Sequence, residues 1–236
     1  MSRNYPKNEM KPRRLFLTAE WRDLAVLNFE VNPWMLRSFV PARTELDLWQ
    51  GKALVSLVGF RFLKTRVLGL HIPFHTDFDE VNLRFYVRGE QGRGVVFIKE
   101  LVPKRAVAFI ARTVYGERYA ATPMSHRKES TNGRTSVSYM WHWRGVENFF
   151  EVTAKGDPEP MAEGSAEEFI FEHYWGYGPQ TYRVEHPPWR VWCATAGKKR
   201  IDGDAIYGAG FGAILAGPPV SCMLAEGSEV SVFRGE

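Results

Sequence analysis

The stretch from Asp79 to Met124 most constrains the fold, because its pattern changes from strand to turn, to a second strand and then to helix. Apolar and polar residues alternate over residues 81–88, which is typical of a strand whose two faces meet different surroundings. The segment GEQGRG at residues 89–94 favours a chain reversal. Residues 95–101 are nearly all apolar, so both faces of this strand are expected to be covered. A hairpin followed by a short helix after Pro103 is predicted.

Similar short elements fill the rest of the chain. Asn32-Pro33 and the capping box that begins at Ser165 predict two helix starts. The pattern predicts hairpins over residues 44–63 and 220–233, with Gly59 as a candidate bulge. It also predicts loops over residues 126–134 and 155–164 and a weakly helical segment over residues 204–215.

In total, about ten short strands and three or four short helices are expected, without regular alternation. This order predicts an α+β fold with a large, mainly antiparallel sheet curled into a partly closed barrel. No composition break divides the chain, so residues 15–236 are predicted to form a single domain. Residues 1–14 are predicted to be a flexible basic tail.

The net charge of +4 resides entirely in that tail, because residues 1–14 hold five basic side chains and one acidic one. A folded nucleic-acid-binding protein carries its charge as a patch on the domain, so no nucleic-acid partner is predicted. No apolar run is long enough for a signal peptide or a membrane span, so no membrane association is expected. A cytoplasmic protein is predicted.

Several segments stand out in this order along the chain, among them TAEWRDLAVLNFEVNP, EVNLRFYVR, GVVFIKELVP, EEFIFEHYWGYG and RVEHPPWRVW. Together they resemble the YqjF-like family of uncharacterised bacterial proteins, which is grouped with the acetoacetate decarboxylase-like fold. The resemblance runs from about residue 15 through nearly the whole chain. It implies a cone-like β-barrel with a few helices and a central cavity.

Acetoacetate decarboxylase works through a lysine that forms a Schiff base with its keto acid. The resemblance lays the corresponding run on residues 111–120, where Arg112 and Gly116 match and Tyr115 stands for a tryptophan. The two lysine positions fall on Tyr119 and Ala120. A tyrosine cannot form an imine, so a Schiff-base decarboxylase is not predicted.

Three groups of polar residues are candidates for a site. The alternating strand places Arg84 on one polar face, which either meets solvent or lines the cavity and pairs with a ligand carboxylate. Glu100 interrupts an apolar strand and lies either at its rim or facing inward. His173 belongs to the cluster EHYWGY, which indicates either aromatic packing at a helix end or a proton-transfer group.

No metal site and no cofactor are predicted. His71 and His75 have the spacing of a helical metal pair, but Pro73 between them argues against a helix. The chain has no phosphate-binding loop or nucleophile elbow, and its GxGxG run does not follow a predicted strand.

Three function classes remain. The leading hypothesis is a protein that binds a small organic molecule, with a carboxylate as one alternative, in the barrel cavity. Arg84, Glu100 and Arg112 would anchor the ligand, and Tyr115, Tyr119 and Tyr177 would form walls. The second class is an enzyme acting on a small keto or carboxylic acid, with Glu100 or His173 in general acid–base catalysis. The third is a homo-oligomeric interaction protein whose interface contains Trp141, Trp143, Trp189 and Trp192.

Overall fold

The computed structural model describes residues 14–108 and 118–234. The strands are β1 (Leu15–Val31), β2 (Thr44–Leu46), β3 (Ala53–Val67), β4 (Leu70–His71), β5 (Phe78–Gly89), β6 (Gly92–Val102), β7 (Tyr119–Ala121), β8 (Met124–Thr131), β9 (Arg134–Trp143), β10 (Val146–Pro160), β11 (Trp175–Gly176), β12 (Tyr182–Glu185), β13 (Arg190–Arg200) and β14 (Ser221–Arg234). The helices are α1 (Pro33–Leu36), α3 (Ala166–Phe171), α4 (Gly203–Tyr207) and α5 (Phe211–Ala216), and residues 105–108 are also helical. The basic tail predicted for residues 1–14 lies almost wholly outside the described residues.

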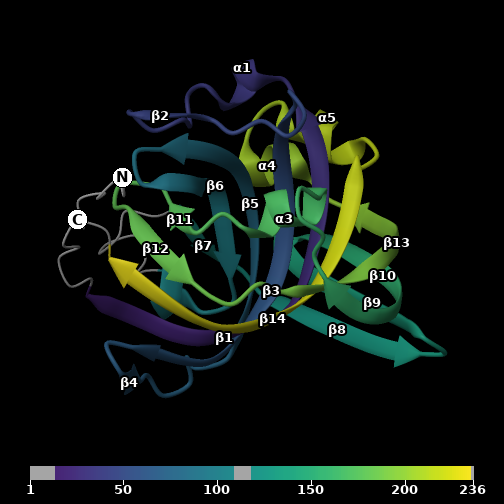
Figure 1. The fold of residues 1–236 in the computed structure, drawn as a ribbon. Coiled ribbons are helices and arrows are strands. Elements are labelled where there is room, and N and C mark those ends of the chain that lie inside the picture. The colour runs from purple at the N-terminus through teal and green to yellow at the C-terminus, as the bar shows by residue number, and fades with distance from the viewer. Residues whose placement is uncertain (1–13, 109–117, 235–236) are drawn as a thin grey trace, which may run out of the picture.

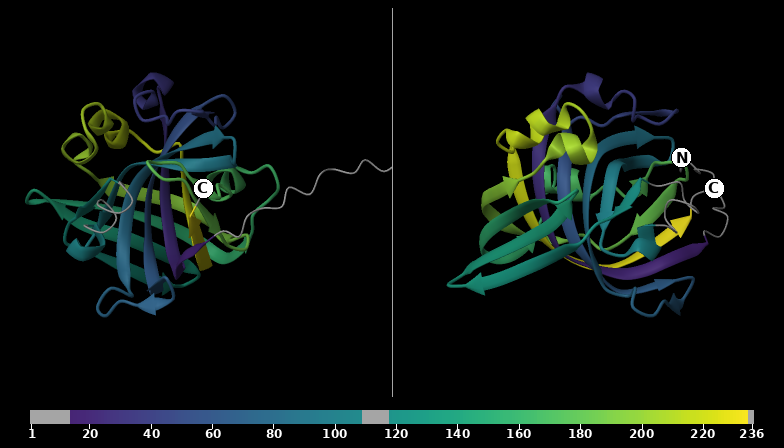
Figure 2. Two further views of the ribbon diagram at one scale, coloured as in Figure 1. Left: turned by 90° about the vertical axis from the view of Figure 1, so that its left-hand side faces the viewer. Right: turned by 180° about the vertical axis from the view of Figure 1, so that it is seen from behind.

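The sheet closes on itself. Seven strands pair in the order β1-β3-β5-β6-β11-β12-β14, and β14 pairs back with β1, so the ring has no free edge. All of these pairings are antiparallel except β11 with β6. Figures 1 and 2 show α1, α4 and α5 gathered at one end of the barrel and β4 at the other. The predicted α+β barrel is therefore confirmed.

A second branch leaves the ring at β14. The N-terminal half of β14 pairs with β13, and β10, β9 and β8 follow in order, while its C-terminal half pairs with β12. This branch covers the outer surface of the ring. Leu27 of β1, Leu57 of β3 and Leu83 of β5 join Trp141 and Phe150 of the branch in one apolar cluster, the outer core.

The other apolar cluster, the inner core, fills part of the ring. Side chains of β1, β3, β5, β6, β12 and β14 contribute to it, among them Val26, Val58, Tyr86, Val95 and Val232. Alternate residues of β5 therefore belong to different cores, as expected for a strand that separates two layers. The two buried faces also explain why β3 and β6 are apolar over most of their length.

Local signals set the ends of several elements as predicted. The side chain of Asn32 accepts a hydrogen bond from the Trp34 amide at the start of α1. Ser165 caps α3 by accepting a hydrogen bond from the Glu168 amide. The predicted hairpin of β5 and β6 is confirmed, with Gly89 opposite Gly92 at its turn.

Other local predictions are wrong because pairing with distant strands overrides the local pattern. Residues 44–46 pair with β5, so the hairpin predicted over residues 44–63 is reduced to one bridge between Trp49 and Lys52. In place of the hairpin predicted over residues 220–233, the chain forms the single strand β14, which passes through Gly227 at a φ of 76° without reversing. The loops predicted after residues 126 and 155 are largely strands β8 and β10.

The structure also differs from the predictions for Gly59 and for residues 204–215. Gly59 is not a bulge: the register shift lies opposite it, between Arg22 and Ala25 of β1, and a Cβ at Gly59 would meet the Tyr139 ring at 2.4 Å. The segment over residues 204–215 is divided into α4 and α5.

The tryptophans proposed for an interface do not form an exposed face. Trp141 and Trp189 are buried inside the chain, and Trp143 and Trp192 are partly buried. Within the described residues, no helix is long and apolar enough to cross a membrane.

Closure of the ring depends on the absence of a side chain at Gly94. A Cβ there would meet the Trp175 carbonyl oxygen at 2.4 Å and the Tyr177 ring at 2.7 Å. We expect Gly94→Ala to lower the free energy of unfolding by about 1–3 kcal/mol, as overpacking does. Urea denaturation measures the change, and Gly217→Ala is the control because its Cβ would come no closer than 3.4 Å to its neighbours. Equal stability of the two variants would contradict the role of Gly94.

Candidate functional site

A cavity of about 250 Å³ lies inside the ring. Most of its wall is aromatic or aliphatic and comes from β1, β3, β5 and the segment before β13. Polar side chains interrupt this wall, among them Glu80, Asn82, Arg84, Glu100, Tyr119 and His173. A mainly apolar pocket with a few convergent polar groups is the usual form of a small-molecule site.

Strand geometry brings the polar groups together. Glu80, Asn82 and Arg84 are alternate residues of β5, so their side chains leave the strand on the same face. Asn82 lies directly opposite Glu100 of β6, and Glu100 neighbours Tyr119 of β7. Alternation along β5 and these two cross-strand pairings therefore build one polar strip from three strands.

The carboxylate end of this strip is organised around Glu80. The Tyr119 hydroxyl donates to one Glu80 oxygen at 3.0 Å, and the Asn82 amide donates to the other at 2.9 Å. Burial raises the pKa of Tyr119 well above its usual value, and the negative charges of Glu100 and Glu80 add to the effect. Tyr119 therefore stays a neutral phenol that donates hydrogen bonds.

Arg84 is the cationic member of the strip. It donates a hydrogen bond to the Ile170 carbonyl oxygen at 3.3 Å, and its Nε is enclosed without a partner. Within residues 14–108 and 118–234, no carboxylate lies within ion-pair distance of its guanidinium. A charge enclosed to this degree normally has a counter-charge.

His173 is held in one orientation by Asp47. The Nε2 of His173 lies 3.2 Å from Oδ2 of Asp47, which also accepts a hydrogen bond from Arg93 at 2.7 Å. Burial raises the pKa of Asp47, but the hydrogen bonds from His173 and Arg93 outweigh it and hold this pKa well below its usual range. Asp47 is thus an acceptor, and Nε2 of His173 carries the proton.

The other ring nitrogen of His173, Nδ1, is enclosed by protein atoms and has no hydrogen-bond partner among the described residues. Burial lowers the pKa of His173 to about 4, and the hydrogen bond to Asp47 only partly opposes this shift. The imidazole is therefore neutral near pH 7.

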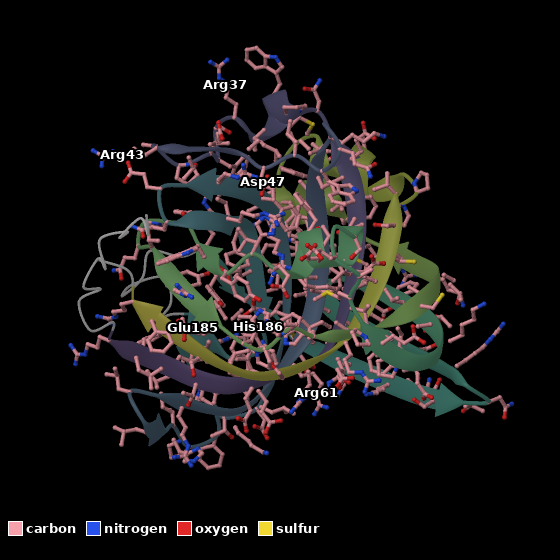
Figure 3. All side chains as sticks on the ribbon, viewed as in Figure 1. Arg37, Arg43, Asp47, Arg61, Glu185 and His186 are labelled. Atoms are coloured by element: carbon pink, nitrogen blue, oxygen red, sulfur yellow. The ribbon has the colours of Figure 1, made fainter. Side chains whose placement is uncertain are left out.

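A second histidine, His186, also lines the cavity. Its ring stacks on Trp189 at 4.1 Å, and burial lowers its pKa as well. The positive charge of Arg84 contributes to the lowered pKa of both His173 and His186. In Figure 3, Asp47, the partner of His173, lies nearer the end with α1, and His186 lies nearer the end with β4.

Comparison with known proteins assigns the chain to a family. Residues 18–229 match DUF2071, a family of uncharacterized conserved proteins. The chain belongs to the DUF2071 family. It is also similar to the uncharacterized protein YqjF of Bacillus subtilis, with 28% identity over 203 residues that cover 80% of this chain and 81% of YqjF.

Solved structures share the fold at low identity. Acetoacetate decarboxylase from Legionella pneumophila superposes with a TM-score of 0.63 at 12% identity, covering 97% of this chain and 90% of that one. MppR, an enduracididine biosynthesis enzyme complexed with pyruvate, superposes with a TM-score of 0.60 at 12% identity. The superposition covers 97% of this chain and 91% of the MppR chain. At this identity the likeness establishes the fold alone.

The predicted site residues divide into three groups. Arg84, Glu100, Tyr119 and His173 line the cavity. Tyr177 does not, because its ring packs against Gly89 and Gly94 in the outer core and its hydroxyl donates to the Gly92 carbonyl oxygen at 2.9 Å. Arg112 and Tyr115 lie outside the described residues.

The sequence reasoning missed two of the polar groups. Glu80 has the same parity as Arg84 on β5, so extending the alternation by one more step would have found it. Asp47 gave no such signal, because it meets His173 across 126 residues of sequence.

No lysine of the described residues lines the cavity. Residues 109–117, which the structure does not describe, contain no lysine in the sequence. Tyr119, on which the resemblance places a lysine, instead contacts Glu80.

The buried histidine predicts a pH dependence of stability. Because the pKa of His173 is about 4 in the folded chain, the unfolded chain binds more protons between that pH and about 6.5. Stability therefore falls as the pH falls through this window. When the pH is lowered from 7.5 to 4, we expect the free energy of unfolding of wild type to fall by about 3 kcal/mol more than that of His173→Gln.

Urea denaturation at several pH values measures this difference. His142→Gln, which removes an exposed imidazole, is the control. A stability difference between wild type and His173→Gln that is constant with pH would show that His173 is not held neutral.

Proposed function

We propose that this chain binds a small organic carboxylate in the barrel cavity, with Arg84 as the anchor. The observation that carries the proposal is the guanidinium of Arg84, which lines the cavity without a carboxylate partner among the described residues. Removing an ion from water is costly unless another charge or several hydrogen bonds replace the lost hydration. A ligand carboxylate would supply both through the two-pronged donor geometry of arginine.

The other polar groups favour one orientation of such a ligand. Glu80 and Glu100 lie further along the strip, and their negative charges repel a carboxylate from that end. His173 and His186 are neutral and lie close enough to Arg84 for its charge to help lower the pKa of each, so they do not compete with it for the anion. The carboxylate would therefore lie at Arg84, with the rest of the ligand along the polar strip and the apolar wall.

One structural neighbour supports an acid as the ligand class. MppR is described in complex with pyruvate, a small keto acid, and it shares this fold. The support concerns the fold's capacity to hold such a molecule, since the identity of 12% is too low to transfer a function.

Proton transfer on the bound acid is a second candidate function. The observation that favours it is the pair of Asp47 and His173, because a carboxylate that orients a neutral imidazole is a recurrent acid–base arrangement. However, Nδ1 of His173 is enclosed by protein atoms, so the ring would have to move to reach a ligand. Binding alone is therefore ranked first.

Replacement of the anchor tests the binding proposal. We expect Arg84→Met to weaken the binding of butanoate by about 10- to 100-fold, because it removes charge-assisted hydrogen bonds. Isothermal titration calorimetry measures the affinity, and butanamide, which has no charge, should bind both proteins alike.

Arg66→Met is the matched control, because it removes an exposed arginine of β3 that does not line the cavity. If Arg84→Met and Arg66→Met weaken binding equally, only the overall charge matters and the anchoring role of Arg84 is wrong.

Hydrogen exchange tests the second candidate. If His173 removes a proton from the bound acid, the protein will accelerate exchange of the pyruvate methyl protons in D₂O, and His173→Gln will slow this by about 100-fold or more. Proton NMR follows the methyl signal, with His142→Gln as the control. A rate in the presence of wild type that equals the buffer rate would eliminate proton transfer on pyruvate and leave the binding proposal intact.

A further inference from the structure

We infer that the preferred ligand is a monocarboxylate with a hydrocarbon tail, close to octanoate in size, rather than an acid as small as pyruvate. This inference rests on the proposed anchoring of a carboxylate at Arg84. It adds the chemistry of the remainder of the ligand, which follows from three features of the cavity: its apolar wall, its volume and its rim.

The first feature is a continuous aromatic wall. Trp21 packs edge-on against Phe60 at 5.1 Å and against Phe62 at 5.6 Å, and Phe62 stacks on Phe78 at 4.7 Å. All four of these side chains line the cavity. Their mutual packing fixes the wall before any ligand arrives, so little ordering cost remains on binding. None of the four carries a charge, and their one polar group is the indole N–H of Trp21, which has no hydrogen-bond partner among the described residues.

The second feature is the size of the hollow. A cavity of about 150 Å³ accommodates benzene, so a cavity of 250 Å³ holds by proportion a ligand of about ten non-hydrogen atoms. Pyruvate has six and would leave much of the aromatic wall facing empty space or water. Octanoate has ten and would cover it.

The third feature is the direction in which the cavity runs. Arg84 lies six residues after Phe78 on β5, and next along the same face is Tyr86, whose hydroxyl is within 2.6 Å of Ser56 Oγ. Both are buried, and they close the cavity beyond Arg84. Phe78 lies toward the opposite end, where Ile72 and His75 also line the cavity. A carboxylate at Arg84 therefore directs the rest of the molecule past Asn82 and Glu80, which are hydrogen-bonded to each other, toward Phe78 and the aromatic wall.

Apolar side chains also gather at the rim at that end, beside His75. Ile72 lines the cavity and is 37% exposed, and its neighbours Leu70 and Phe74 are 71% and 88% exposed. Figure 1 shows β4, which contains Leu70, at the end of the barrel opposite α1. Apolar surface thus continues from the aromatic wall to the outside, and the end of a hydrocarbon tail would meet no charged group at Ile72.

A chain-length series tests the inference. Calorimetric titration with acetate, butanoate, hexanoate, octanoate and dodecanoate, each as a monomer in solution, should give affinities that rise about fourfold for each added methylene. The rise should level off near octanoate, where the cavity is full. Octanamide and octylamine should bind more weakly than octanoate, and Arg84→Met should abolish the preference for the acid over the amide.

Two exposed positions provide a matched pair of variants. Ile72→Asp places a charge at the cavity rim, and we expect it to weaken the binding of octanoate at least tenfold while leaving acetate unchanged. Leu70→Asp makes the same chemical change on a neighbouring exposed residue that does not line the cavity, and it should have no effect. Because both side chains are exposed, both variants should fold, and thermal unfolding checks this.

The outcomes separate the inference from the proposed function. If all acids bind with equal affinity and all depend on Arg84, the tail is not recognised and this inference fails, whereas the proposed function stands. If affinity rises with chain length but octanamide binds as well as octanoate, with or without Arg84, the carboxylate anchor is wrong and both fail. An equal loss of octanoate binding in the two aspartate variants would also overturn the placement of the tail at the rim.

Discussion

The structure depends on one strand, β1, which pairs with both β3 and β14. An isolated sheet of this length would expose two edges, whereas β1 joins the first part of the chain to its last strand and closes the ring. The closure requires strong local curvature. Asp23 of β1 has a φ of 59°, and Gly227 of β14 lies opposite Arg22, which donates a hydrogen bond to its carbonyl oxygen. These two irregularities bend the two strands together.

Closure determines what the interior can contain. A ring of seven strands is narrow, and its interior is filled partly by aromatic side chains and partly by charged ones. Most of these charges are balanced locally. Asp47 contacts Arg88, Arg93 and His173, and Glu80 accepts hydrogen bonds from Tyr119 and Asn82. Arg84 differs from them because its one hydrogen bond among the described residues goes to a neutral carbonyl group. Arg84 is therefore a charged side chain of the polar strip that has no counter-charge among the described residues.

The parts of the site that could be predicted from sequence are those set within one strand or one hairpin. Alternation over residues 81–88 placed Asn82 and Arg84 on one face, and the hairpin register brought Glu100 to the same face. Whether that face met solvent or a cavity could not be decided, because the answer depends on the pairing of β1 with β14 across most of the chain. The contact between Asp47 and His173 was hidden for the same reason. Likewise, residues 44–46 left their predicted hairpin because β5 offered an unpaired edge.

Tyr119 shows what the polar strip can and cannot do. A lysine amine at this position could capture a keto acid covalently, because an imine forms at a neutral nitrogen. The phenol of Tyr119 donates to Glu80 and is surrounded by negative charge, so its proton is held and it is not a nucleophile. A ligand beside Tyr119 would then be held there by non-covalent contacts. A pyruvate-sized acid offers one carboxylate and little apolar surface for that purpose, so strong retention requires either further hydrogen bonds or a longer apolar tail. The aromatic wall that extends from Trp21 to Phe78 supplies the surface for the tail.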